Sequence, residues 1–464
     1  MFAGAPVVHA SDTHDDDPET TEVVVKLNFA GNATIDAVNA AFGTTTIEEL
    51  VGSSAIYRLR VRNGSEAEDV AEDMQDDARV LYAEPNYNSE APEGNPRHIG
   101  AWGGPADDDA AQQTAVGLLG ISDAHEFAQG EGVVVAVLDT GFQLDHPDLV
   151  DVWTSARYDF IDDDDDPADV ANGDDDDGDG HVDEAFGHGT HVAGIVHLTA
   201  PSARIMPVRV LEADGRGNIF VIAEAIQYAI DNGADVINLS LGSPQESELM
   251  EEILEDAVED QDVIVVAAAG NLNSEVEQFP ASEDEVLAVT SIDVDSHRSE
   301  FANYGEWIDV AAPGEAIVSA FPVSDHAAWS GTSMAVPFVS GHAALLRSAV
   351  PGMNAGQIAA YVRASAQSLD ALNPGLDQGL GAGRINIGGS IRAICEENGV
   401  CSAPDLTGTL ILESRAVVDS RPADSLIGTW IIGGHTYVAD AKTEFRQDAG
   451  ALATGVCVDV EFQN

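Results

Sequence analysis

The chain has 464 residues, long enough for two or three domains, and carries 82 acidic against 19 basic residues, a formal net charge of −63. Such a surface excludes general binding to nucleic acids or to anionic membranes. The lysines are Lys26 and Lys442 alone. High acidity with few lysines is typical of halophilic proteins, which stay soluble in strong salt, but a GC-rich genome also replaces lysine by arginine, so both explanations stay open.

The first residues raise the question of export. Residues 1–10 lack a basic segment and a full apolar segment, so they predict no complete signal peptide, although residues 8–10 followed by Ser11 are similar to a small-residue cleavage site. Residues 1–22, rich in Asp, Thr and Pro, are expected to be a disordered leader remnant. No run of eighteen apolar residues occurs, so we expect no membrane span.

Residues 23–90 alternate between strand-like and helix-like patterns. The apolar spacing predicts two helices, at 35–41 and 67–74, and four strands, at 23–27, 45–50, 55–61 and 80–85. This order is typical of a small α+β domain of the ferredoxin-like kind. Residues 91–118, rich in Gly, Pro, Asp and Ala, are expected to form a linker.

Three separated segments hold residue types that suit nucleophilic catalysis. Residues 132–138 are continuously apolar, as in a strand buried on both faces, and Asp139 follows at its carboxyl end, the edge where open α/β sheets place their sites. His188 lies in GHGTHVAG at 187–194, and Ser333 in GTSMAVP at 331–337. The glycine turn before Ser333 places its hydroxyl at a helix N-terminus, beside free N–H groups. A serine needs a base and an orienting carboxylate, and His188 and Asp139 are the candidates.

These motifs, with HPDL at 146–149 and VVAAAGN at 265–271, resemble the catalytic domain of subtilisin-like serine proteases (subtilases). The resemblance implies a doubly wound, mostly parallel α/β sheet over residues 119–395. It also implies a catalytic triad of Asp139, His188 and Ser333, in the chain order of subtilisin, with Asn271 in the oxyanion hole. Helix patterns at 220–232, 249–258 and 335–348, and strand patterns at 208–211, 236–239 and 263–268, agree with a parallel sheet covered on both sides.

The resemblance also assigns roles around this domain. It implies that residues 23–90 are a prodomain, acting in cis as chaperone and inhibitor, with residues 83–87 as the tail in the substrate cleft; an ordinary α+β domain is the alternative. Substrate would bind as an added strand between two backbone segments, with simple strand-end turns as the alternative. These segments comprise Gly215, Arg216, Gly217, Ser240, Leu241 and Gly242.

The acidic loop before His188 contains a candidate calcium site. Residues 175–183 fit the pattern D-x-D-x-D-G-x-x-D, which supplies oxygen ligands and a turn glycine as in an EF-hand loop. The expected glutamate at position 12 is replaced by Phe186, so other groups would complete the coordination, and a merely solvated loop is the alternative. The candidate ligands for a structural Ca²⁺ are Asp175, Asp177, Asp179, His181 (through its carbonyl) and Asp183.

Residues after about 405 have a pattern of short strands that differs from the alternating strands and helices before them. Short strands at 406–412, 429–432, 436–438 and 455–462 with glycine-rich turns predict a small all-β domain over residues 405–464. A stability cap and a substrate-binding or surface-binding module are both compatible with it. Cys395 and Cys401 bracket a short loop and would pair in an exported protein, leaving Cys457 single.

Taken together, the residues and the family resemblance imply a secreted, monomeric serine endopeptidase that works through an acyl-enzyme and is made as an autoprocessed zymogen. Its partners would be protein or peptide substrates and its own prodomain. Two alternatives stay open: a catalytically silent, calcium-dependent binding protein on a protease scaffold, and a dedicated maturation protease that acts on few substrates.

Overall fold

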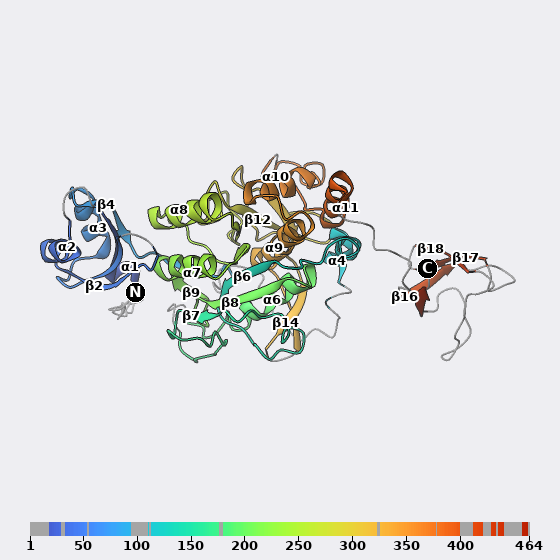
Figure 1. Cartoon of the computed structure of the whole chain (residues 1–464), viewed down its shortest axis with the longest axis horizontal. Coiled ribbons are helices and arrows are strands. Elements are labelled where there is room, and N and C mark those ends of the chain that lie inside the picture. The colour runs from blue at the N-terminus through green and yellow to red at the C-terminus, as the bar shows by residue number, and fades with distance from the viewer. Residues whose placement is uncertain are drawn as a thin grey trace, which may run out of the picture. The chain divides into compact units, whose positions relative to one another are not determined.

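The structure is a computed structural model, shown in Figure 1. It describes residues 18–28, 33–52, 55–93, 110, 113–175, 180–322, 325–376 and 378–399, and the strands at 412–420, 428–432, 435–439 and 457–462. The chain divides into two units, residues 1–401 and 402–464. Among the helices in these ranges, none combines the length and apolarity needed to cross a bilayer.

The first unit begins with the small α+β domain. Its sheet has the strand order β2-β3-β1-β4 with antiparallel pairs, the arrangement that the βαββαβ pattern predicts. The predicted elements are confirmed to within one residue at each end, and a short helix precedes them inside the expected leader. The elements are α1 (Pro18–Thr21), β1 (Glu22–Leu27), α2 (Ile35–Phe42), β2 (Thr44–Glu49), β3 (Ile56–Val61), α3 (Ala67–Gln75) and β4 (Val80–Pro85).

This four-stranded sheet is buried on both faces. Val23 and Val25 point into a core shared with α2 and α3. Val24 and Ile56 point the other way, into a core formed with the helices of the following domain. Because successive side chains of a strand alternate between faces, β1 is apolar on both, and the domain docks through the face that its own helices leave open.

A seven-stranded sheet forms the centre of the next domain, in the order β13-β12-β11-β10-β6-β8-β7. Every neighbouring pair in it is parallel, as predicted. Strand β8 lies on one side of β6, and β10, the next strand of this sheet along the chain, lies on the other side. This reversal of strand order creates a switch point at the carboxyl ends of these strands. The strands are β6 (Val134–Asp139), β7 (Tyr158–Asp159), β8 (Arg204–Arg209), β10 (Val236–Leu239), β11 (Ile264–Ala268), β12 (Leu287–Ile292) and β13 (Val310–Pro313).

Helices cover both faces of this sheet, which explains why the strands read as continuous apolar runs. Val135 and Val137 of β6 pack with α6 (His188–Thr199) and α9 (Thr332–Ala349). Ala136 and Leu138 pack on the opposite face with α7 (Ile219–Asp231) and α8 (Glu248–Glu255). Figure 1 shows the helices α6, α7, α8 and α9 around the strands of the sheet. The strand predicted at 208–211 is corrected, because β8 lies four residues earlier.

The remaining elements of the first unit are short strands and peripheral helices. They are β5 (Asn88–Glu90), α4 (Thr114–Leu119), α5 (Ile121–Ala124), β9 (Arg216–Asn218), the π-helical turn η3 (Asp256–Asp260), the hairpin β14 (Ile317–Phe321) and β15 (Asp325–Trp329), α10 (Ala355–Ser365) and α11 (Ile387–Asn398). Helix α4 begins inside the expected linker. Cys395 of α11 is disulfide-bonded; its pairing with Cys401 stays a prediction, because Cys401 lies outside the described residues.

The second unit contains an antiparallel sheet of order β18-β17-β16-β19. Its strands are β16 (Leu412–Ser420), β17 (Gly428–Ile432), β18 (His435–Ala439) and β19 (Cys457–Phe462). The first strand was expected at 406–412, of which only Leu412 lies within the described residues. A complete all-β domain over 405–464 stays a prediction.

Candidate active site

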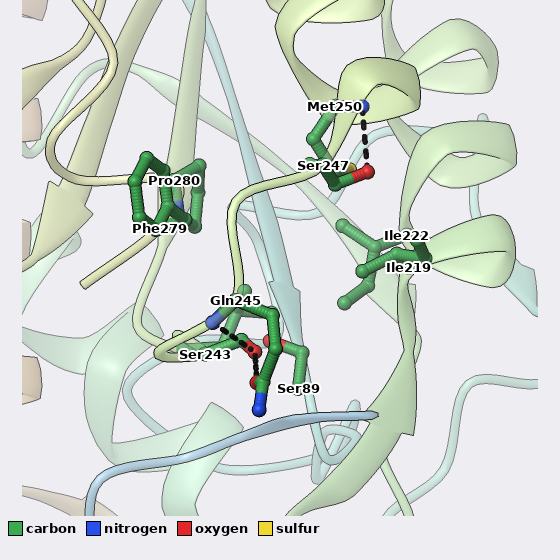
Figure 2. A pocket seen from close by; sticks show the side chains of 10 residues that line it. Ser89, Ile219, Ile222, Ser243, Gln245, Ser247, Met250, Phe279 and Pro280 are labelled. Carbon is green, nitrogen blue, oxygen red and sulfur yellow. Dashed lines mark hydrogen bonds between the residues drawn. The ribbon is translucent and has the colours of Figure 1, made fainter. Parts of the chain in front are cut away.

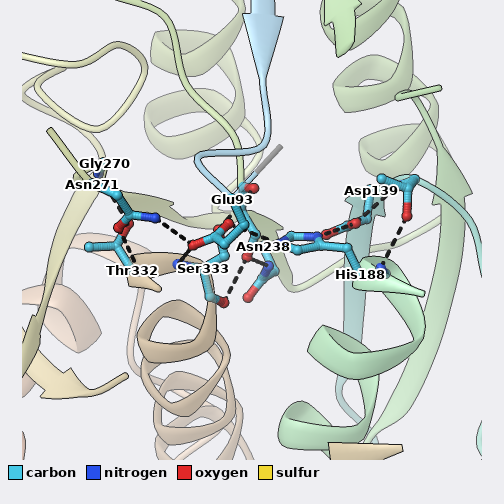
Figure 3. Close-up of polar contacts among 11 residues, drawn as sticks. Glu93, Asp139, His188, Asn238, Gly270, Asn271, Thr332 and Ser333 are labelled. Carbon is cyan, nitrogen blue, oxygen red and sulfur yellow. Dashed lines mark hydrogen bonds and ion pairs between the residues drawn. The ribbon is translucent and has the colours of Figure 1, made fainter. Parts of the chain in front are cut away.

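The carboxylate of Asp139 orients the imidazole of His188. Asp139 ends β6 and is fully buried at the carboxyl edge of the sheet. Its Oδ1 accepts hydrogen bonds from the N–H of Thr140 (2.8 Å) and from Nδ1 of His188 (2.6 Å). The bond at Nδ1 leaves Nε2 facing the start of α9 (Figure 3).

Glycine permits the close approach of α6 to the end of β6. His188 is the first residue of α6, and a Cβ on Gly189 would lie 2.4 Å from the carbonyl oxygen of Gly141 and 3.1 Å from Cβ of Asp139. Any side chain at Gly189 would therefore push the helix away from the strand. The ring of Trp329 packs beside His188, with centroids 5.6 Å apart.

Ser333 lies in the first turn of α9, as predicted, and Asn271 faces it. The N–H and the hydroxyl of Thr332 both donate to Oδ1 of Asn271, at 3.0 Å each. These two bonds fix the amide so that its Nδ2 and the backbone N–H of Ser333 face the same space. Two donors that converge on one point are what an oxyanion requires.

A fifth side chain, Glu93, occupies that point. Its Oε2 accepts from the Ser333 hydroxyl (2.5 Å) and lies 3.1 Å from Nε2 of His188, while its Oε1 accepts from Nδ2 of Asn271 (2.7 Å) and from the N–H of Ser333 (3.4 Å). Glu93 is 6% exposed. The hydroxyl and the imidazole therefore meet through a shared carboxylate oxygen (Figure 3). No motif or spacing in the sequence pointed to this residue.

The carboxylates of Glu93 and Asp139 flank the ring of His188 and change its protonation state. Burial disfavours the charged form of His188, but Asp139 and Glu93 outweigh it and raise the pKa of His188 to about 10. Burial also opposes ionisation of Glu93, yet the hydrogen bond and charge of His188, with the bonds from Ser333 and Asn271, hold the pKa of Glu93 below its ordinary value. At neutral pH His188 is therefore an imidazolium between two carboxylates and cannot accept the Ser333 proton.

The chain before Glu93 lies between the two predicted cleft segments. Strand β5 pairs antiparallel with β9, placing Ser89 opposite Gly217 and Glu90 opposite Arg216. Glu90 also exchanges both backbone hydrogen bonds with Gly242 at 2.9 Å. The N–H of Ala91 donates to the carbonyl of Gly215 at 2.8 Å.

Continued by two residues, the antiparallel register of Glu90 with Gly242 brings Pro92 opposite Ser240. Proline has no N–H to donate there. The carbonyl oxygen of Ser240 instead lies 3.3 Å from Oγ of Ser333, whose single proton is directed at Glu93. The tail thus pairs as an added strand up to Ala91. At Pro92 it has no N–H for the Ser240 carbonyl, and Glu93 follows.

Two pockets adjoin this strand. Ser89 borders a small cavity of about 10 Å³ with Leu241, Ile222 and Met250 (Figure 2). Pro92 borders a larger pocket of about 320 Å³, lined also by Gly242, Ala268, Asn271 and Gln278. The predicted cleft residues are thereby brought together: Gly215, Arg216, Gly217 and Gly242 by backbone pairing, Ser240 by its carbonyl and Leu241 by a pocket wall.

The predicted position of the tail is corrected. Residues 80–85 form strand β4, and the cleft segment is 88–93. Glu84 instead caps α8, accepting from the Ser247 hydroxyl (2.8 Å) and from the N–H groups of Glu248 and Leu249 (3.0 Å each). Burial raises the pKa of Glu84. Its carboxylate holds the prodomain against a helix N-terminus, where negative charge is favoured.

The predicted calcium loop is only partly described, since Asp177 and Asp179 lie outside the described residues. Oδ2 of Asp175 accepts from the N–H of Gly180 (3.0 Å), and Asp183 accepts from the N–H groups of Asn172 (2.8 Å) and Gly173 (3.1 Å). Within the part of the chain that the structure describes, no three acidic, His or Cys side chains are grouped to hold a metal ion.

Comparisons with known proteins agree with this geometry. Residues 130–383 match the subtilase family, and residues 6–86 match the fervidolysin N-terminal prodomain. The thermophilic serine proteinase of Bacillus sp. (strain AK1) is 37% identical over 333 residues, covering 68% of this chain and 76% of that protein. Thermitase of Thermoactinomyces vulgaris is 39% identical over 256 residues, covering 53% and 85%.

A solved structure is also similar. A protease from Pseudoalteromonas arctica PAMC 21717 has a TM-score of 0.54 and 31% sequence identity, covering 59% of this chain and 94% of that one. Strand order, motif order and these similarities coincide over the same residues. The chain therefore belongs to the subtilase family of serine proteases and carries a fervidolysin-type prodomain at its N-terminal side.

Proposed function

We propose that the protein is a secreted serine endopeptidase that uses Asp139, His188 and Ser333 as its triad and is made as an autoprocessed zymogen. The observation that carries this proposal is the environment of the Glu93 carboxylate. Ser333, Asn271 and His188 all direct a hydrogen-bonding group at it. A set of groups that binds a carboxylate in this way is also suited to bind the oxyanion of a peptide under attack.

Once Glu93 leaves, His188 keeps only one carboxylate neighbour, so its pKa falls and its Nε2 becomes free to act as base. The Ser333 proton passes to Nε2 while Oγ bonds to the peptide carbonyl carbon. The oxyanion takes hydrogen bonds from Nδ2 of Asn271 and the N–H of Ser333. The C–N bond then breaks, the amine leaves with the proton from His188, and water hydrolyses the acyl-enzyme by the reverse sequence.

The prodomain would act as inhibitor through two contacts. Its tail binds as a strand between Gly215–Gly217 and Ser240–Gly242, and its sheet packs on α7 and α8. Processing in the segment that follows Glu93 would release the cleft, and export is what the resemblance to secreted subtilases implies. The C-terminal strands are proposed to belong to a small all-β accessory domain.

We further propose that residues 175–183 bind a structural Ca²⁺. The contact of Asp175 with the N–H of Gly180 joins the first loop position to its turn glycine, a closure that suits an EF-hand-like loop. Each carboxylate retains lone pairs for a cation. Asp175, Asp177, Asp179, Asp183 and the His181 carbonyl would hold the ion, which would order the loop that leads to His188.

Labelling with a fluorophosphonate probe tests the activity. We expect the processed wild type to be labelled and the Ser333→Ala variant to remain unlabelled and at full length. The N-terminus of the purified protein, read by mass spectrometry, locates the processing bond. A folded, prodomain-free wild type that takes no label would favour the catalytically silent binding protein, and a cleavage profile on a peptide library separates a general protease from a dedicated one.

A further inference from the structure

Asp169 joins the two segments that carry Asp139 and His188. Its Oδ2 accepts the N–H of Gly187, the residue directly before His188, at 2.6 Å. Its backbone follows the chain just after Asp139: the N–H of Phe142 donates to the carbonyl of Pro167 at 2.9 Å, and the N–H of Asp169 lies 3.4 Å from the carbonyl of Phe142. One residue thus contacts both the exit of β6 and the start of α6.

The approach of these segments is close enough to require glycine. Gly141 has φ 128°, and a Cβ on it would lie 2.7 Å from Cα of Asp169. Gly187, which receives the Asp169 bond, has φ 90°. Both glycines adopt backbone conformations that other residues rarely accept. The contact between Asp169 and the start of α6 therefore depends on glycine at both positions.

The carboxylate of Asp169 is also electrostatically coupled to the site. Its Oδ1 is shielded from solvent and has no hydrogen-bond partner within the described residues. Burial, with the negative charge of Asp139, raises the pKa of Asp169 to about 7, although the Gly187 N–H and the charges of Arg209 and His188 oppose the rise. These three residues, Asp139, His188 and Arg209, are the charged groups that act on it.

We infer that Asp169 is a positioning residue for His188: it ties the first turn of α6 to the end of β6, so that Nδ1 stays on the Asp139 carboxylate, and its negative charge supports the imidazolium. The inference rests on the proposed function for its kinetic consequences. Asp169 touches neither the reacting atoms nor the substrate strand, so it acts through His188 alone.

Two variants separate its two roles. Asp169→Ala removes both the acceptor and the charge, whereas Asp169→Asn keeps an oxygen for the Gly187 N–H and removes only the charge. Asp164→Asn is the matched control, because Asp164 lies in the same acidic loop, is exposed, and likewise accepts a backbone N–H, that of Asp166 at 2.8 Å.

The assay is peptide hydrolysis by the processed enzyme from pH 5 to 10. For Asp169→Ala we expect kcat to fall at least about tenfold with KM changed less than twofold, since misorientation of a base affects the chemical step. Asp169→Asn should recover most of kcat, because the amide oxygen still accepts the Gly187 N–H. The acid limb of the kcat/KM profile should stay near that of the wild type, because Asp169, with its pKa of about 7, carries little charge at that pH. Asp164→Asn should match the wild type in both.

A second measurement needs no turnover. NMR titration of His188 in the full-length chain with Ser333→Ala should show a lower His188 pKa when Asp169→Asn is added and no change with Asp164→Asn. Equal kinetics and equal His188 titration in the Asp169 and Asp164 variants would overturn the inference. So would equal loss of kcat in Asp169→Ala and Asp169→Asn with an unmoved His188 titration, which marks a purely structural residue. An inactive wild type would refute the proposed function instead, and the titration would still decide the role of Asp169.

Discussion

Replacing Glu93 by Gln should make Ser333 accessible in the full-length chain. The wild-type carboxylate accepts from Ser333 and Asn271 and pairs with a charged His188, all in a buried site. Breaking one partner of such a pair generally costs about 2–5 kcal/mol. Because Gln keeps one oxygen acceptor, we take the lower end, about 2 kcal/mol, which corresponds to about 30-fold more of the open form.

The assay is a short pulse of fluorophosphonate probe on freshly made protein, with the label read on the band of full-length mass. Glu90→Gln is the matched control, because Glu90 lies in the same tail and bonds to Gly242 through its backbone. We expect about 30-fold faster labelling of the full-length band for Glu93→Gln and less than a twofold change for Glu90→Gln. Equal labelling of the two variants would refute the view that the side chain of Glu93, rather than the pairing of the tail, closes the site.

Four further outcomes follow from the same geometry. Asn271→Ala should lower kcat by about 10²–10³-fold with little change in KM, the loss known for an oxyanion donor in subtilisin, itself a member of this family; steady-state kinetics on a peptide would check it, and a change in KM alone would contradict it. Glu84→Gln should weaken the hold of the prodomain by about 1–3 kcal/mol, which hydrogen exchange at α8 in the full-length Ser333→Ala chain would reveal, with exposed Glu68→Gln as control. The stabilisation of the folded chain by the contacts of His188 with Asp139 and Glu93 should depend on pH. The pKa of His188 in the folded chain, about 10, exceeds the ordinary 6.5, so this stabilisation is complete below about pH 6.5 and lost as the pH rises through about 10. The difference in Tm between Ser333→Ala chains with and without Glu93→Gln should therefore shrink toward pH 10, and a constant difference would argue against a charged His188. Removing calcium with a chelator should lower Tm and Asp175→Asn should reduce that effect, whereas a Tm indifferent to both would indicate a merely solvated loop.

The sequence was most informative where local pattern and tertiary structure impose the same constraint. The prodomain helices and strands could be predicted because their apolar spacing already marks two buried faces, as Val23 and Val24 illustrate. Strand β8 was misplaced because Pro207 lies within it, paired in register with Val137, and a proline argues against an inner strand. The cleft residues at 215–217 and 240–242 came from family resemblance, since nothing local distinguishes them from ordinary turns.

Glu93 and Asp169 show what such reasoning misses. Each is an acidic residue in an acidic chain, and each acts through partners far along the sequence: Ser333 for Glu93 and Gly187 for Asp169. Their roles depend on burial and on the register of distant backbones, which composition and spacing do not contain. The tail was placed five residues too early for the same reason, because a strand that pairs within its own domain and one that pairs in a cleft have similar patterns.

Because Pro92 has no backbone N–H, it bears on what would follow the proposed processing of the chain. While attached, the tail competes from a high effective concentration and needs little intrinsic affinity to fill the cleft. Once severed from the catalytic domain, the prodomain is held by its packed sheet and by its tail alone, and any peptide able to donate an N–H to the Ser240 carbonyl gains a contact that the tail cannot make. On the proposed function, Pro92 would therefore favour displacement of the tail by substrate after processing, which would make activation harder to reverse.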